Sequence, residues 1–170
     1  MKLNRDALLI LKKAIIYFVV AFVAALLQTS FLAVVAPFGS VPDLVLLLVL
    51  GAGYFCGPAV GGIFGLVAGV LAYAIGGVGF AVEPLLYTAV GAFTGFLVEN
   101  FFKGKFSVWC FYVIFAAIMK GGVSLLVIML FSSDLQLFAS IWRTLIPEFI
   151  GTVVLGAALY LPIRRVCVYF

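Results

Sequence analysis

The stretch from Leu44 to Ile75, LVLLLVLGAGYFCGPAVGGIFGLVAGVLAYAI, decides the fold class because it contains no charged side chain. A bilayer core about 30 Å thick is crossed by about 20 helical residues, so this stretch is too long for one span. Gly57-Pro58 lies near its middle, and such a pair interrupts a helix. We therefore expect two short antiparallel membrane helices, at residues 43–56 and 59–75.

The composition of the whole chain indicates a membrane location. Of its 170 residues, 67% are hydrophobic and only 9% are charged, whereas soluble domains average about 45–50% apolar and about 25% charged residues. A water-soluble domain cannot bury so much apolar surface, so we expect an integral membrane protein with one membrane domain, residues 1–170. The long first apolar run lacks a small-residue cleavage motif, which argues against a cleavable signal peptide.

Proline, glycine and charged residues divide the rest of the chain into further spans. We expect these spans at residues 14–36, 84–98, 107–131 and 146–163. Residues 1–13 and 135–145 each combine an apolar stripe with a polar face, which predicts helices lying in the membrane interface. The predicted fold is all-α, a polytopic membrane helix bundle with six transmembrane helices.

The basic residues predict the orientation of this bundle. With the N-terminus inside, most of them lie on one side of the membrane: Lys2, Arg5, Lys12, Lys13, Lys103, Lys105, Arg164 and Arg165. Arg143 would lie outside, and this bias satisfies the positive-inside rule. A five-span arrangement that fuses 43–56 with 59–75 would place Lys103 and Lys105 opposite the N-terminus. We therefore expect six spans, both termini in the cytoplasm, and an inner basic face that contacts anionic lipids.

The sequence contains no group of residues typical of catalysis or metal binding. Histidine, the commonest general base and metal ligand near neutral pH, is absent. Cys56, Cys110 and Cys167 are scattered without metal-ligand spacing and are predicted to be free thiols. Gly76-Gly77-Val78-Gly79 lacks the Lys-Ser/Thr of a phosphate loop. We expect no enzymatic activity, cofactor or metal, and the basic charge alone does not indicate nucleic acid.

Glycine spacing is the clearest pattern within the spans. Glycines recur at four-residue intervals at Gly53, Gly57, Gly61, Gly65 and Gly69, and again at Gly91 and Gly95. In a bilayer, small residues four apart allow helix backbones to approach closely. One interpretation of these glycines is a docking face for a partner's transmembrane helix. The alternative is packing among the helices of this chain.

Lys120 is the one basic residue in the middle of a predicted span. A cation there costs about 2.5–3.5 kcal/mol on insertion scales, so its side chain is expected to face protein or water. Lys120 either binds an anionic substrate or serves in a relay, or it pairs with a carboxylate or with Gln28. Asp43, Glu83 and Glu148 each stand at the outer start of a span, where a carboxylate is favoured as a helix cap.

The order of several motifs resembles that of a known family. These motifs are Leu27-Gln28-Thr29-Ser30-Phe31-Leu32, Pro42-Asp43-Leu44, the glycine rows, Leu145-Ile146-Pro147-Glu148 and the terminal pair Arg164-Arg165. In order, spacing and length the chain resembles MreD, the bacterial rod shape-determining membrane protein family. Gln28 and the Pro42-Asp43-Leu44 turn are the most specific elements of this resemblance.

The resemblance implies a non-enzymatic scaffold of the cell-elongation machinery in the bacterial inner membrane. Its implied partner is MreC, whose single span would pack beside Gln28, beside the outer turn at Pro42-Asp43 and on the glycine faces. Through MreC it would be linked to MreB, RodA and its penicillin-binding transpeptidase, and so to rod shape and peptidoglycan synthesis.

The MreD family is also similar in fold to the substrate-binding subunits of energy-coupling-factor vitamin transporters. The alternative function is therefore a small-molecule-binding membrane subunit of a vitamin-type transporter. Ala21 and Ala25 have the small-residue spacing that such a subunit would use to dock a coupling partner. Lys120 and the outer carboxylates of Asp43, Glu83 and Glu148 would then line its ligand cavity.

Overall fold

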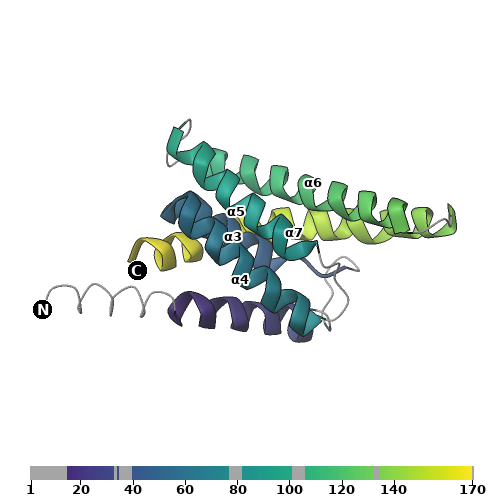
Figure 1. Ribbon diagram of the computed structural model, residues 1–170, viewed down its shortest axis with the longest axis horizontal. Helices are drawn as coiled ribbons and strands as arrows, with labels where there is room; N and C mark the ends of the chain where they lie inside the picture. Colours follow the sequence, from purple (N-terminus) through teal and green to yellow (C-terminus); the bar gives the residue numbers. More distant parts are fainter. Residues whose placement is uncertain are drawn as a thin grey trace, which may run out of the picture.

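All the elements that the structure describes are helices, as the predicted all-α class requires (Figure 1). The computed structural model describes residues 15–32, 34, 40–76, 82–100, 106–131 and 135–169. The predicted interfacial helix at 1–13 lies outside these ranges.

The order of the helices follows the predicted spans closely. An N-terminal helix covers residues 15–32 and ends in a π-helical turn, η1 (Leu27–Leu32). It is followed by α3 (Leu44–Cys56), α4 (Pro58–Gly76), α5 (Glu83–Asn100), α6 (Phe106–Phe131) and α7 (Leu135–Tyr169). The ends of α3 to α6 lie within two residues of the ranges expected from the sequence.

The C-terminal region differs from the prediction. We expected an interfacial helix at 135–145 and a separate span at 146–163, whereas α7 is one helix that continues through Pro147 and Pro162. Proline removes a backbone hydrogen bond and often kinks a helix. A break in hydrocarbon would leave more backbone groups unsatisfied, and packing against neighbouring helices lets membrane helices tolerate proline. The local signal of Pro147 was therefore a poor guide to where the helix begins.

The break at Gly57-Pro58 is found where the sequence predicted it. Gly57 has φ +93°, a left-handed conformation that side-chain-bearing residues rarely adopt, and Pro58 is the first residue of α4. Because the chain reverses here, Gly53 and Gly61 face each other, and a Cβ built on Gly61 would lie 2.5 Å from Gly53 Cα. Helices α3 and α4 therefore form an antiparallel hairpin (Figure 1).

Helix α3 is the centre of the bundle. Its buried residues include Leu46, Leu47 and Leu50. The N-terminal helix lies beside α4, where Tyr17 and Phe64 form a ring contact (Figure 1). Helices α6 and α7 run side by side, and Trp109 Nε1 of α6 donates a hydrogen bond of 2.8 Å to the Gly156 carbonyl of α7 (Figure 1).

The outer faces of the helices are apolar, as expected for a membrane protein. Among the described residues, three segments are long and apolar enough to cross a membrane: Pro58–Ile75, Phe106–Val127 and Arg143–Arg165. Two shorter apolar helices, Ile15–Ser30 and Leu44–Cys56, accompany them. Large apolar side chains such as Ile63 of α4 and Leu130 of α6 are exposed, which fits contact with lipid rather than with water.

Candidate functional site

Asp43 is the centre of a buried polar site at the start of α3. Its Oδ1 accepts a hydrogen bond of 2.9 Å from the Leu46 backbone N–H, so Asp43 caps α3 as predicted. The backbone N–H of Asp43 donates to Thr152 Oγ1 of α7 at 3.0 Å. Only 1% of its side chain is exposed. A carboxylate this deeply buried requires a cation or several hydrogen-bond donors.

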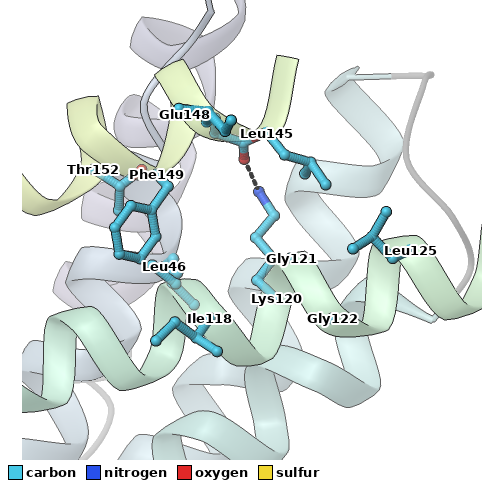
Figure 2. A pocket seen from close by; sticks show the side chains of 12 residues that line it. Leu46, Ile118, Lys120, Gly121, Gly122, Leu125, Leu145, Glu148, Phe149 and Thr152 are labelled. Carbon is cyan, nitrogen blue, oxygen red and sulfur yellow. Dashed lines mark hydrogen bonds and ion pairs between the residues drawn. The ribbon is translucent and has the colours of Figure 1, made fainter. Parts of the chain in front are cut away.

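Lys120 supplies that cation. Its Nζ lies 2.5 Å from Asp43 Oδ2 and 2.6 Å from Glu148 Oε1. Figure 2 shows the Lys120 side chain reaching from α6 toward Glu148 on α7. These are the carboxylate partners that the structural interpretation of Lys120 expects. Asp43 stands at the start of α3, but Glu148 lies inside α7 because this helix already begins at Leu135, so its predicted capping role is wrong. Both carboxylates are brought to one cation from different helices.

Two further side chains complete the site from other helices. Tyr87 Oη of α5 donates a hydrogen bond of 2.7 Å to Asp43 Oδ2. Gln28 Oε1 of the N-terminal helix accepts one of 3.1 Å from the Val45 backbone N–H. We name the group Gln28, Asp43, Tyr87, Lys120, Glu148 and Thr152 the Asp43 cluster. Sequence reasoning missed Tyr87 and Thr152, because a tyrosine or threonine within an apolar span gives no signal of its partner.

The Asp43 cluster ties together the N-terminal helix, α3, α5, α6 and α7. No buried side-chain nitrogen or oxygen among the described residues lacks a hydrogen-bond partner. Such a satisfied network fixes helices relative to one another, and removing one member leaves a buried charge without compensation. In chemical terms the cluster is a structural tie with two carboxylates for one ammonium group. It contains no paired nucleophile and base.

The third outer carboxylate, Glu83, lies apart from this tie. It lines a small pocket together with Lys120 and Val123, and the described ion pairs of Lys120 are with Asp43 and Glu148. Glu83 stands at the first position of α5, where the helix dipole favours a carboxylate, and its capping role stays a prediction.

The glycine rows lie at contacts between helices of this chain. A Cβ built on Gly65 would lie 2.7 Å from the backbone carbon of Tyr87, and one on Gly69 would lie 2.6 Å from Pro84 Cα. Gly95 similarly meets Pro58 Cα at 2.5 Å. These are the intrachain contacts of the packing alternative. A partner's helix on the same glycines would have to displace α5 from α4, so docking there remains a prediction.

The other glycines follow the same arrangement around Gly91 of α5. A Cβ built on Gly53 or on Gly61 would lie against the Gly91 carbonyl oxygen. A Cβ on Gly57 would lie 2.8 Å from Glu99 Oε1. The glycines at the centre of α3, α4 and α5 therefore let three backbones meet without intervening side chains.

A cavity of about 360 Å³ lies between α6 and α7, beside the Asp43 cluster. Figure 2 shows the side chains that line it, and Leu46 of α3 is one of them. The lining residues are Leu46, Ala117, Ile118, Lys120, Gly121, Gly122, Leu125, Leu145, Ile146, Glu148, Phe149 and Thr152. Lys120 and Glu148 therefore line it, as the transporter alternative expects, whereas Asp43 and Glu83 do not.

No group of three or more metal-ligating side chains occurs in the parts of the chain that the structure describes. Cys110 is a free thiol, and Cys56 Sγ lies 3.2 Å from Tyr17 Oη. The side chain of Cys167 is outside the described part of the structure.

Comparison with known proteins identifies the family. No curated protein and no solved structure matches the chain. Residues 1–163 match the sequence profile of a family described as 5TMR of 5TMR-LYT, a five-TM receptor family. The match runs from the first residue to the end of the last predicted span, so it includes the whole Asp43 cluster and the glycine rows. The chain therefore belongs to the 5TMR of 5TMR-LYT family of membrane proteins.

Proposed function

We propose that the chain is a non-enzymatic scaffold of the cell-elongation machinery, controlling rod shape and peptidoglycan synthesis by packing against MreC. One observation carries the proposal. The Asp43 cluster joins Gln28, the Pro42-Asp43-Leu44 turn and Glu148, which are the polar elements of the MreD-like motifs. Residues far apart in the sequence thus serve one structural tie, which supports reading the motifs as a unit. The five-TM description of the family is compatible with a membrane scaffold but does not name MreD.

The proposed mechanism is helix packing on a rigid frame. The Asp43 cluster fixes the N-terminal helix to α3 through the bond from Val45 N–H to Gln28 Oε1. The outer face of the N-terminal helix then carries a continuous exposed stripe: Ile15, Phe18, Val19, Phe22 and Val23. We assign the MreC span to this stripe, because the glycine faces already pack within the chain.

The proposed topology has six spans with both termini in the cytoplasm of a bacterial inner membrane. The positive-inside distribution supports this arrangement. The family description names five spans, and the described residues contain three long and two short apolar helices. The six-span proposal adds α5 as a further crossing, closely packed on α4 along its glycines. MreC would link this scaffold to MreB and to RodA with its penicillin-binding transpeptidase.

Co-purification tests the scaffold proposal. The chain and tagged MreC are expressed together, and the recovered ratio is compared for wild type, a Phe18→Ala/Phe22→Ala variant and a Phe96→Ala control on α5. Phe18 and Phe96 are similarly exposed, at 49% and 53%. We expect the double variant to lose most of the MreC while the control retains it. A folded chain that never recovers MreC in any form would contradict the proposal.

The cavity beside Lys120 favours a second candidate, a small-molecule-binding subunit of a vitamin-type transporter. Its volume of about 360 Å³ lies within the range of about 300–1,000 Å³ of ligand pockets. Ala21 and Ala25, however, are both buried within the chain and offer no exposed face to a coupling partner. A thermal-shift screen of vitamin-sized ligands tests this candidate, and a screen without any stabilising ligand would count against it.

A further inference from the structure

The cavity between α6 and α7 opens on the apolar flank of the protein. We call it the α6–α7 groove. Ile118 and Ile146 line it and are themselves 58% and 51% exposed, so the groove faces the surroundings of the helices rather than the interior. Its polar end is formed by Lys120 and Glu148, and most of the remaining lining is apolar (Figure 2). An occupant therefore needs a polar head and an aliphatic body.

Two adjacent glycines keep the groove open. A Cβ built on Gly121 or Gly122 would meet nothing within 4 Å. Glycine within a helix costs about 0.8–1 kcal/mol relative to alanine. At Gly61 and Gly91 that cost is offset by close backbone packing. At Gly121 and Gly122 no contact of this chain offsets it, and a larger side chain at Gly122 would instead project into the groove.

The span expected from the sequence places the polar end of the groove near the lipid headgroups. That span runs from 146 to 163, so Glu148 stands two residues from its start. At 1.5 Å per residue this is a depth of about 3 Å. The span itself is about 27 Å long, which matches the hydrocarbon core of about 30 Å without the headgroup layers. On this placement Glu148 is near the boundary between headgroups and acyl chains.

Charge at this boundary favours a cationic head. Lys120 faces the two carboxylates of Asp43 and Glu148, so the three groups carry a net charge of −1. Glu83 is a further carboxyl group, and it lines the neighbouring pocket together with Lys120. Glu148 accepts from Lys120 through Oε1 only, which leaves its second oxygen able to accept another bond. Lys120 has used two of its three N–H donors.

We propose that the α6–α7 groove binds a phospholipid of the phosphatidylethanolamine class. Its ammonium group donates to the second carboxylate oxygen of Glu148, and the zwitterionic headgroup adds no net charge to the site. Its phosphate accepts the remaining N–H of Lys120, and an acyl chain lies over Gly121 and Gly122. An anionic lipid without an amine would bring a further negative charge beside Asp43 and Glu148. This lipid site is independent of the scaffold function proposed above.

The test measures lipids retained by the purified full-length chain. The protein is reconstituted in bilayers of equal phosphatidylethanolamine and phosphatidylglycerol, extracted in mild detergent and examined by native mass spectrometry. We expect about one retained phosphatidylethanolamine per chain, with a preference over phosphatidylglycerol of about tenfold, as a charge-assisted hydrogen bond supplies. Glu148→Gln keeps an oxygen for Lys120 and should abolish the preference.

A second pair of variants tests the apolar part of the groove. Gly122→Leu fills the groove and should reduce lipid retention about tenfold, whereas Ala89→Leu at an exposed position of α5 should leave it unchanged. If Gly122→Leu does not fold, Gly122→Ala replaces it in the same measurement of lipid retention. Equal retention of both lipids by the wild type, or full retention by Gly122→Leu, would overturn the proposal. The proposal would also be overturned if Gly122→Leu no longer recovered MreC but retained the lipid unchanged, because that result would assign the groove to a partner's helix.

Discussion

The α3–α4–α5 contact and the Asp43 cluster hold the helices together in opposite ways. In the first, Gly53, Gly61 and Gly91 bring backbone against backbone. In the second, Lys120 and Asp43 bring opposite charges together from α6 and the start of α3. Glycine packing depends on the absence of side chains and is lost by adding atoms. The cluster depends on the presence of charges and is lost by removing them.

The difference also shows where the helix bundle has room for an added side chain. A Cβ built on Gly53, Gly61 or Gly91 would lie within 2.5 Å of another helix's backbone, whereas the cluster borders the α6–α7 groove. Gly121 and Gly122 stand beside Lys120 but touch nothing within 4 Å of a Cβ position. The same residue type therefore closes one part of the molecule and opens the other. Substitutions of matched size in the two regions separate these roles.

The largest effect is expected from removing the central carboxylate. Asp43→Ala deletes the main partner of Lys120 and the cap of α3, and loss of one member of a buried ion pair costs about 3–5 kcal/mol. The free energy of unfolding can be measured in mixed micelles by tryptophan fluorescence. Glu99→Ala, at an exposed position of α5, is the control and should change it by less than about 0.5 kcal/mol.

Glu148→Ala provides the comparison within the cluster. Its side chain is 22% exposed, against 1% for Asp43, so water or lipid headgroups compensate part of the loss. We expect a smaller destabilisation than for Asp43→Ala. An equal or larger cost at Glu148 would show that Asp43 is not the centre of the cluster.

The next largest effect is the interaction free energy between Lys120 and Asp43. Lys120→Met alone leaves Asp43 and Glu148 without their cation, and adding Asp43→Asn removes one of the uncompensated charges. We expect the double variant to be less destabilised than the sum of the single variants by about 0.5–3 kcal/mol. A double-mutant cycle of unfolding free energies measures this term. Strict additivity would mean that the ion pair contributes no interaction of its own.

The sequence allowed the helical class and the Gly57-Pro58 break to be predicted, because both depend on local properties. An uncharged stretch identifies membrane helices, and a Gly-Pro pair stops a helix wherever it occurs. The capping role of Asp43 was predictable for the same reason, since its Oδ1 bonds to Leu46, three residues away. The continuity of α7 was not, because the effect of Pro147 depends on the helices packed around it.

The Asp43 cluster was predictable only in part. A lysine within a span requires a counter-charge, so a carboxylate partner for Lys120 was expected. Which carboxylate it meets depends on the relative placement of α3, α6 and α7, and Asp43 lies 77 residues away along the chain. Tyr87 gave no signal at all, because its hydroxyl identifies its partner only once α5 is packed against α3.

A smaller effect is expected from adding one methyl group in the glycine-packed region. In Gly61→Ala the new Cβ would lie 2.5 Å from Gly53 Cα and would also approach the Gly91 carbonyl oxygen. Because those atoms belong to backbones, neither can rotate away, and overpacking of this kind costs about 1–3 kcal/mol. The unfolding free energy is again the measurement. A neutral result would show that α3 and α4 are not in close contact in the membrane.

The smallest effect should have the opposite sign. Gly122→Ala adds the same methyl group to a helix, but at a position where nothing lies within 4 Å. Alanine is favoured over glycine in a helix interior by about 0.8–1 kcal/mol, and it also restricts the unfolded chain. We therefore expect a stabilisation of up to about 1 kcal/mol in detergent micelles that contain no phospholipid. If Gly122→Ala is instead as destabilising as Gly61→Ala, α6 and α7 lie closer together than the structure places them, and the groove is closed.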